Sequence, residues 1–144
     1  MTTVDQIAVL LENQKGALAA VTKILGENGH NILALSIAEV DSFGVCRMIL
    51  PDCDAAARLL RQKGYTVRIG QVLVAEVPDR PNGLSHVLSI AQGEDISLEY
   101  LYSFVRCTGR DALLIFAFSD IQGAADALEQ NGVKLLSLEQ VLSR

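Results

Sequence analysis

The chain repeats one pattern twice. Residues 7–69 and 72–135 each read as strand, helix, strand, strand, helix, strand. Near-matching turns open the first helix of each copy, over residues 13–18 and 79–84, and Lys15 corresponds to Pro81 at an offset of 66 residues (81 − 15). Internal repetition of this kind indicates a fold built from two copies of one module. We therefore expect a functional site to lie where copies meet.

The first copy is predicted from its apolar spacing. Residues 7–11 are apolar on both faces, which is typical of a central strand. Leu18, Val21 and Leu25 form the stripe of a following helix. Residues 32–38 and 45–50 predict a hairpin that turns through 41–44. Asp52 or Asp54 is expected to cap a second helix, whose inward residues would include Leu59, and residues 66–69 return as a strand.

The second copy repeats this order. Residues 72–77 predict a strand, and Leu84, Val87, Leu88 and Ala91 the stripe of a helix. Paired strands are expected over 96–102 and 113–117, with Tyr100 and Tyr102 on one sheet face. Asp120 is expected to cap a helix that ends at Gly132, and residues 134–136 close the sheet. Ser137 and Gln140 stand at capping-box spacing, so residues 138–142 predict a short helix.

Together these elements predict an α+β protein with two ferredoxin-like βαββαβ units in tandem, over residues 1–70 and 71–144. Each unit would have an antiparallel sheet with both helices on one face. The first strand is apolar on both faces, and half of all residues are hydrophobic. The face without helices therefore needs cover, and a second copy of the chain, in a homodimer, is the simplest candidate.

Composition excludes several function classes. The formal net charge is −5 with no run of Lys or Arg, which argues against nucleic acid and anionic membranes as partners. No apolar run approaches the length that spans a bilayer, and the start of the chain does not resemble a secretory signal. Three cysteines without CxxC spacing suggest structural thiols in a reducing, cytoplasmic setting. We expect no cofactor and no metal site.

The turn after the first strand is the most specific local signal. A polar residue, Asn13 or Asp79, ends the strand, and Gly16 or Asn82-Gly83 then permits unusual backbone angles at the helix start. Backbone N–H groups at a helix start favour a carboxylate ligand. Asn13 could instead simply cap its helix, as could Asp79. The residues of the turn leave both interpretations open.

The order of these motifs resembles the ACT domain, a small-molecule-binding regulatory module. Residues 11–18, Leu-Glu-Asn-Gln-Lys-Gly-Ala-Leu, are similar to that family's strand-end turn, which has Asx, then Pro-Gly, then Leu. Residues 29–32, Gly-His-Asn-Ile, are similar to the start of its second strand. The similarity extends through nearly all of both halves. The chain thus resembles a stand-alone tandem ACT protein.

The resemblance implies a ligand, expected to be a free amino acid, between two ACT units, contacted by Asn13 and Asn31. Leu11 replaces the His of serine-binding members, which argues against serine specificity, and Lys15 replaces the usual Pro that Pro81 keeps. In the second half the corresponding acids are Asp79 and Asp95, so the first-half turn should receive a carboxylate better. The implied ligand-binding residues are Leu11, Asn13, Gln14, Lys15, Gly16, Ala17, Leu18, His30, Asn31, Ile32, Asp79, Asn82, Gly83, Leu84 and Asp95.

This interpretation predicts a non-enzymatic regulator whose output passes to a separate enzyme or other partner. A subunit that binds only protein is an open alternative, because caps and ligand-binding turns look alike. An acylphosphatase-like enzyme is a further alternative, and Arg47, Arg80 and Arg106 are its candidate phosphate ligands. No accompanying catalytic constellation supports it. An RNA-binding module would need stacking aromatics on a basic sheet, which the 45–49 strand lacks.

Overall fold

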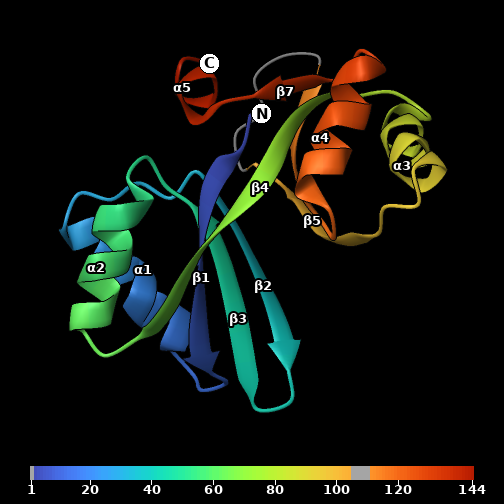
Figure 1. The fold of residues 1–144 in the computed structure, drawn as a ribbon. Coiled ribbons are helices and arrows are strands. Elements are labelled where there is room, and N and C mark those ends of the chain that lie inside the picture. Colours follow the sequence, from blue (N-terminus) through green and yellow to red (C-terminus); the bar gives the residue numbers. More distant parts are fainter. Residues whose placement is uncertain (1, 105–110) are drawn as a thin grey trace. The chain divides into compact units, whose positions relative to one another are not determined.

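The computed structural model describes residues 2–104 and 111–144. The chain divides into two compact units, each drawn in Figure 1. The N-terminal unit comprises residues 5–70, and the C-terminal unit comprises residues 71–144 with the residues before Asp5. Each unit contains one copy of the repeated pattern. The α+β class and the two βαββαβ units predicted from the repeat are confirmed.

The N-terminal unit is a four-stranded sheet with two helices. Its elements are β1 (Val4–Glu12), α1 (Ala17–Glu27), β2 (Ala34–Val40), β3 (Phe43–Ile49), α2 (Cys53–Gln62) and the first part of β4 (Thr66–Pro78). The strand order is β2-β3-β1-β4. Strand β3 pairs antiparallel with both β1 and β2, with Val9 opposite Cys46 and Ile37 also opposite Cys46.

Both helices of this unit lie on one face of the sheet, beside β1 to β3 in Figure 1. Alternate residues of β1 point toward them because side chains in a strand alternate between faces. The core between sheet and helices consists of buried Ile7, Val9, Leu11, Val21, Leu25, Cys46, Met48, Leu50, Cys53, Ala56, Ala57, Leu60 and Val67. The opposite face, which carries no helix, is described further below.

The C-terminal unit repeats the arrangement. The rest of β4 is followed by α3 (Gly83–Gly93), β5 (Leu98–Ser103), β6 (Asp111–Phe118), α4 (Ile121–Gln130), β7 (Lys134–Leu136) and α5 (Leu138–Leu142). The strand order is β7-β4-β6-β5, equivalent to that of the first unit. Helices α3 and α4 cover a core that includes Leu73, Ala75, Phe116 and Leu128. Tyr100 and Tyr102 share a face as predicted, with ring centroids 6.4 Å apart.

Three of the helices begin with a side-chain cap. The Asp52 carboxylate accepts a hydrogen bond from the Ala55 N–H at 3.0 Å, so Asp52 and not Asp54 caps α2. Asp120 accepts one from the Gly123 N–H at 3.0 Å at the start of α4. Ser137 and Gln140 form the predicted capping box of α5. Each cap pairs a backbone donor that a helix start otherwise leaves without a partner.

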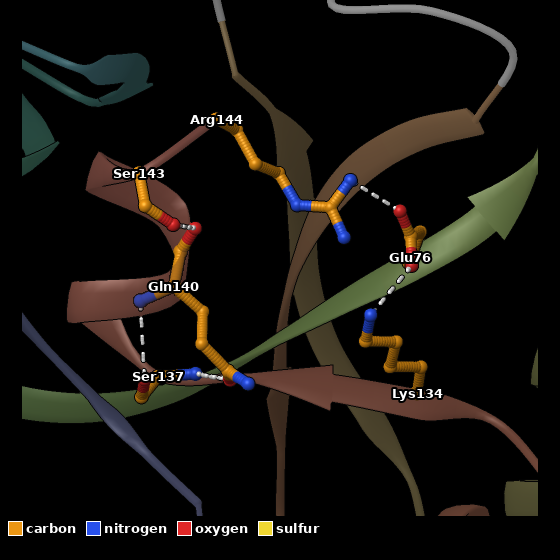
Figure 2. A network of polar contacts seen from close by, with 6 residues as sticks. All are labelled: Glu76, Lys134, Ser137, Gln140, Ser143 and Arg144. Carbon is orange, nitrogen blue, oxygen red and sulfur yellow. Dashed lines mark hydrogen bonds and ion pairs between the residues drawn. The ribbon is translucent and has the colours of Figure 1, made fainter.

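A polar network holds α5 against the sheet of the C-terminal unit (Figure 2). An Arg144 nitrogen lies 2.5 Å from one carboxylate oxygen of Glu76 on β4, and Lys134 Nζ lies 3.7 Å from the other. Glu76 and Lys134 face each other across the β4–β7 pair, on the sheet face away from α3 and α4. Helix α5 therefore covers part of the face that α3 and α4 leave open.

Some predicted boundaries differ from the structure. Strand β4 runs without a break from Thr66 through Gly70 to Pro78, whereas the sequence predicted two strands. Strand β2 begins at Ala34, two residues later than predicted. The His30 N–H still bonds the Leu25 carbonyl at the end of α1, so the chain is in a loop until shortly before the strand. Leu59 is only half-buried and Leu84 is exposed, so the predicted stripes were too wide.

Candidate ligand-binding site

The turn between β1 and α1 is built by backbone hydrogen bonds. The Asn13 N–H donates to the Ser42 carbonyl at 2.8 Å, and the Gln14 N–H donates to the Glu12 carbonyl at 2.7 Å. Gly16 then takes the left-handed conformation, with φ of 84°. A side chain at this position would be strained, so glycine suits the turn. Helix α1 begins at the next residue, Ala17, four residues after Asn13.

Helix α1 begins without a side-chain cap. Its N-cap residue is Gly16, and no side chain accepts a bond from the first turn. Within the described residues, the backbone N–H groups of Leu18 and Ala19 have no hydrogen-bond partner. The interpretation that Asn13 caps this helix is therefore wrong. Two unpaired donors and the positive end of the helix dipole instead point outward, as at sites that bind carboxylates or phosphates.

The corresponding turn between β4 and α3 has the same backbone geometry. The Arg80 N–H bonds the Pro78 carbonyl, the Gly83 N–H bonds the Arg80 carbonyl, and Asn82 takes the left-handed conformation with φ of 68°. Helix α3 also starts without a side-chain cap, so the capping interpretation of Asp79 is wrong as well. Gly83 is required for a different reason. A Cβ there would lie 2.2 Å from the Pro78 carbonyl oxygen.

Polar side chains surround the first turn. The Asn13 side-chain amide donates to a Glu39 carboxylate oxygen at 2.6 Å. The Gln14 side-chain amide donates to a Glu12 carboxylate oxygen at 2.8 Å. The two amide groups thus hold two carboxylates near a helix start that favours negative charge. This turn therefore presents both hydrogen-bond donors and carboxylates, as an ammonium-bearing and carboxylate-bearing ligand requires.

A cleft of about 470 Å³ opens beside this turn. Its lining residues are Leu10, Leu11, Glu12, Gln14, Ala17, Phe43, Gly64, Tyr65 and Thr66. A smaller hollow of about 320 Å³ next to it is lined by Glu12, Asn13, Gln14, Ser42 and Phe43. The larger volume lies in the range of small-molecule sites, and its walls combine apolar, aromatic and carboxylate groups.

The structure gathers part of the predicted first-half site. Leu11, Gln14 and Ala17 line the larger cleft, and Asn13 lines the smaller hollow. Gly16 and Leu18 provide the turn and one unpaired donor, while Lys15 is exposed. The sequence interpretation did not include the walls at Leu10, Phe43 and Tyr65. Phe43 and Tyr65 are distant from the turn in sequence, so no local pattern pointed to them. Leu10 is next to Leu11 on β1, and the sequence predicted only that its strand is apolar on both faces.

The second predicted loop of the first half lies elsewhere. His30, Asn31 and Ile32 follow the C-terminal end of α1, while Asn13 precedes its N-terminal end. Eleven helical residues separate the two loops by about 16 Å along the helix axis. One small ligand cannot contact both loops of the same unit.

Asp95 is not, as the sequence had suggested, the second-half counterpart of Asn31. The Asp95 N–H bonds the Gln92 carbonyl with φ of 56°, just as the Gly29 N–H bonds the Gly26 carbonyl with φ of 78°. Asp95 is therefore the counterpart of Gly29, and Ser97 is the counterpart of Asn31. Asp95 lies at the rim of a separate cleft of about 360 Å³ with an apolar floor that includes Leu88 and Phe118. Asp79, Asn82 and Leu84 are exposed around the other end of α3.

The cysteines are embedded in the N-terminal core. Burial raises the pKa of the Cys46 thiol to about 11. Burial is also the main cause that raises the pKa of Cys53, whose thiol donates toward the Leu50 carbonyl. Cys107 and Arg106 lie outside the described residues. Among residues 2–104 and 111–144, no three His, Cys, Asp or Glu side chains gather in a group that could hold a metal ion. In the same residues, no helix is long and apolar enough to cross a membrane.

The two remaining arginines of the acylphosphatase alternative belong to different units. Arg47 is on β3, opposite Ala8 and Ser36, and Arg80 is in the β4–α3 turn of the other unit. Within residues 2–104 and 111–144, each unit therefore contains one arginine of this set.

The chain is similar to known proteins over nearly its whole length. A search of the curated proteins finds no match. Among solved structures, a protein from Bacteroides thetaiotaomicron is similar at 30% sequence identity and a TM-score of 0.89, covering 96% of this chain and 95% of that chain. The aspartate kinase regulatory subunit from Thermus thermophilus shares the fold, with a TM-score of 0.62, 14% identity and coverage of 90% and 91%.

The same subunit from Thermus flavus has a TM-score of 0.61 at 13% identity, covering 90% of this chain and 96% of that chain. The model of the family described as ACT domain pair matches residues 1–142. Because this match extends over nearly the whole chain, and two copies of the module are present, the chain belongs to the ACT domain pair family.

Proposed function

We propose that this protein is a non-enzymatic regulator that binds a free amino acid at the β1–α1 turn, between ACT units. Residues 1–70 and 71–144 would each act as one such unit in a cytoplasmic protein. The observation that carries the proposal is the uncapped start of α1 beside a 470 Å³ cleft. Helices α2, α4 and α5 all have side-chain caps, so the missing cap is particular to the family's turn.

The cleft offers a partner for each part of an amino acid. The unpaired N–H groups of Leu18 and Ala19 would receive the ligand carboxylate. The Glu12 carboxylate, which also lines the cleft, would hold the ammonium group. Leu10 and Phe43 would contact the ligand side chain. These walls favour an apolar or aromatic side chain over a small polar one.

The second-half turn is the weaker carboxylate receiver. It has the same backbone geometry, but Asp79 stands where the first half has Asn13. A fixed negative charge near the helix start repels a carboxylate, whereas an amide does not. We therefore assign the higher affinity to the turn of the N-terminal unit.

A complete site would use two units. Asn13 and Asn31 lie at opposite ends of α1. A ligand that contacts Asn13 of one unit can therefore contact Asn31 only in the 29–32 loop of another unit. A homodimer supplies such a loop. Ligand binding would then favour one assembly by differential affinity, and a separate regulated enzyme would sense that assembly.

The proposal is tested by a thermal-shift screen of the purified protein against the twenty amino acids, followed by calorimetry of any hit. A ligand at 100 times its Kd stabilises the folded state by about 2.7 kcal/mol. We expect one chemically related group of amino acids to raise the Tm. The amine that lacks the carboxylate of the best ligand should not raise it, because the helix start would have nothing to bind.

Two matched variants locate the site. Asn13→Ala removes an amide at the start of α1 and should weaken binding at least tenfold. Asn131→Ala removes an exposed amide at the end of α4, where its side chain donates to the Ala127 carbonyl far from the turn in the chain, and should leave the affinity unchanged. Equal affinity of both variants would remove Asn13 from the site. The absence of any shift with all twenty amino acids would contradict amino-acid sensing and favour a subunit that binds only protein.

A further inference from the structure

The helix-free face of the N-terminal unit has three rows of side chains, defined by the β1–β3–β2 register. One end row contains Arg47 and Ala8, the middle row Val45 and Leu10, and the other end row Phe43 and Glu12. Strand β2 adds Ser36, Ala38 and Val40 to these rows in the same order. From β4, Arg68 and Thr66 line one shallow hollow with Ala8, Leu10 and Val45, which places them on the same face.

This face is apolar and exposed over its middle and one end. Leu10 is 43% exposed, Phe43 43% and Val40 57%. Single exposed apolar residues are common on soluble proteins. Here they are neighbours in adjacent strands, and contiguous exposed apolar residues of this kind mark interaction surfaces.

The duplication shows what the same face looks like when it is covered. Val74 and Ile115 of the C-terminal unit are equivalent to Ala8 and Arg47, because each pair is opposed across the corresponding strands. Gly64 and Gly132 end their helices with the same backbone hydrogen bonds and a positive φ, which makes Leu136 the equivalent of Arg68. Val74, Ile115 and Leu136 are all fully buried. Helix α5 lies against β7 there, and Arg144 reaches from it to Glu76 (Figure 2). No helix of the described N-terminal unit has this role, because α1 and α2 lie on the other face.

The charges of the face have opposite signs at its two ends. Arg47 lies in one end row, and Glu12 lies in the other. The equivalent of Arg68, Leu136, lies opposite Val74, which is the equivalent of Ala8, so the duplication assigns Arg68 to the row of Arg47. A two-fold axis through the middle row would bring each end row onto the opposite end row of a second copy. The same surface on both partners would then be self-complementary, which is what an isologous dimer interface needs.

We propose that a second copy of this chain docks on the helix-free face of the N-terminal unit, with the apolar middle rows in contact and Arg68 of each copy against Glu12 of the other. This proposal deepens the homodimer of the proposed function and rests on it. Two sheets packed face to face lie about 10 Å apart, so side chains of this size can interdigitate.

The size of the face determines how stable such a dimer is. Four strands about 4.8 Å apart and three rows about 6.6 Å apart cover roughly 400 Å² on each partner. Stable interfaces bury about 800 Å² on each partner, so this one belongs to the weak, concentration-dependent class. Leu10, Phe43 and Thr66 line both the face and the 470 Å³ cleft. A docked partner would therefore border the cleft. Its Arg68 and the ligand ammonium would share the two oxygens of the Glu12 carboxylate, so a ligand there would shift the dimer equilibrium.

The experiment is sedimentation equilibrium over a wide concentration range, first without amino acids. Arg68→Glu and Glu12→Arg each place like charges together at both ends of the interface, and each should raise the dimer dissociation constant at least tenfold. An equimolar mixture of the two variants should restore association, because both contacts of the mixed dimer then pair opposite charges. Arg58→Glu makes the same change on an exposed residue of α2 and should have no effect. Circular dichroism checks that each variant is folded.

The outcomes separate the interface from the dimer itself. The docking surface is supported if each single substitution raises the dimer dissociation constant and the equimolar mixture lowers it again. A dimer that is unaffected by either change, or that the mixture does not restore, overturns the surface and leaves the homodimer in place. A monomer at all concentrations, with or without the best amino-acid ligand, overturns both. Amino-acid affinity, measured by calorimetry on the natural chain, tests the ligand site separately.

Discussion

Replacement of Gly83 by alanine tests the turn that opens α3. The new Cβ would lie 2.2 Å from the Pro78 carbonyl oxygen, so the backbone must move by about 1 Å or more. That oxygen accepts the Arg80 N–H bond at 2.9 Å, and its displacement weakens the bond. Overpacking costs about 1–3 kcal/mol and a lost hydrogen bond about 1 kcal/mol. The lower entropy of the unfolded alanine chain returns about 0.5 kcal/mol. We expect Gly83→Ala to lower the free energy of unfolding by about 2–3 kcal/mol.

The same helix provides the control. Gly93 ends α3, and a Cβ there would meet no atom within 4 Å. Gly93→Ala should therefore stabilise the protein by about 0.5 kcal/mol. Urea unfolding followed by circular dichroism, with the m-values compared, measures both changes. A Gly83→Ala variant as stable as the natural chain, beside a stabilised Gly93→Ala variant, would refute the close-contact argument.

Three further results follow from the structure. Because burial raises the Cys46 pKa from 9.0 to about 11, the stability that this thiol contributes is complete below pH 9 and declines toward pH 11, by up to about 2.7 kcal/mol. Urea titrations at several pH values should show this decline, and Cys46→Ala should reduce it. Arg144→Ala leaves Glu76 with Lys134 alone and should cost about 1–2 kcal/mol, with faster hydrogen exchange in α5 as the local sign of detachment. Asp120→Ala removes the α4 cap and should cost about 1 kcal/mol in thermal unfolding, whereas an unchanged Tm would show that water replaces the cap.

The repeat made most of the fold predictable. Turn residues and apolar spacing recur in the same order in both halves, and each element of the predicted βαββαβ pattern is present. Caps were predictable where a side chain bonds its own helix start, as Asp120 and Ser137 do, because this chemistry is local. Boundaries at β2 and β4 were not, since they depend on hydrogen bonds to other segments. A glycine at position 70 predicts a break between two strands, yet β4 continues through Gly70.

The candidate site divides in the same way. The sequence pointed to Asn13, Gly16 and Leu18 because their spacing forms one turn. It could not show whether Asn13 caps the helix, since this depends on Glu39, which lies 26 residues further along the chain. The sequence interpretation also made Asp95 the second-half counterpart of Asn31, whereas the backbone hydrogen bonds make Asp95 the counterpart of Gly29. Phe43 and Tyr65 reach the cleft from other elements, and no local pattern reports that proximity.

By itself, the amino-acid sequence determined the duplicated module, the order of its elements and the two turns, because strand alternation, helical spacing and turn chemistry act over only a few residues. Tertiary structure decided which donors of α1 stay unpaired, which walls form the cleft and which sheet face α5 covers. Those properties arise from contacts between residues far apart in the chain. They depend on the strand register, and a shift of one residue would move every side chain of a strand to the other face.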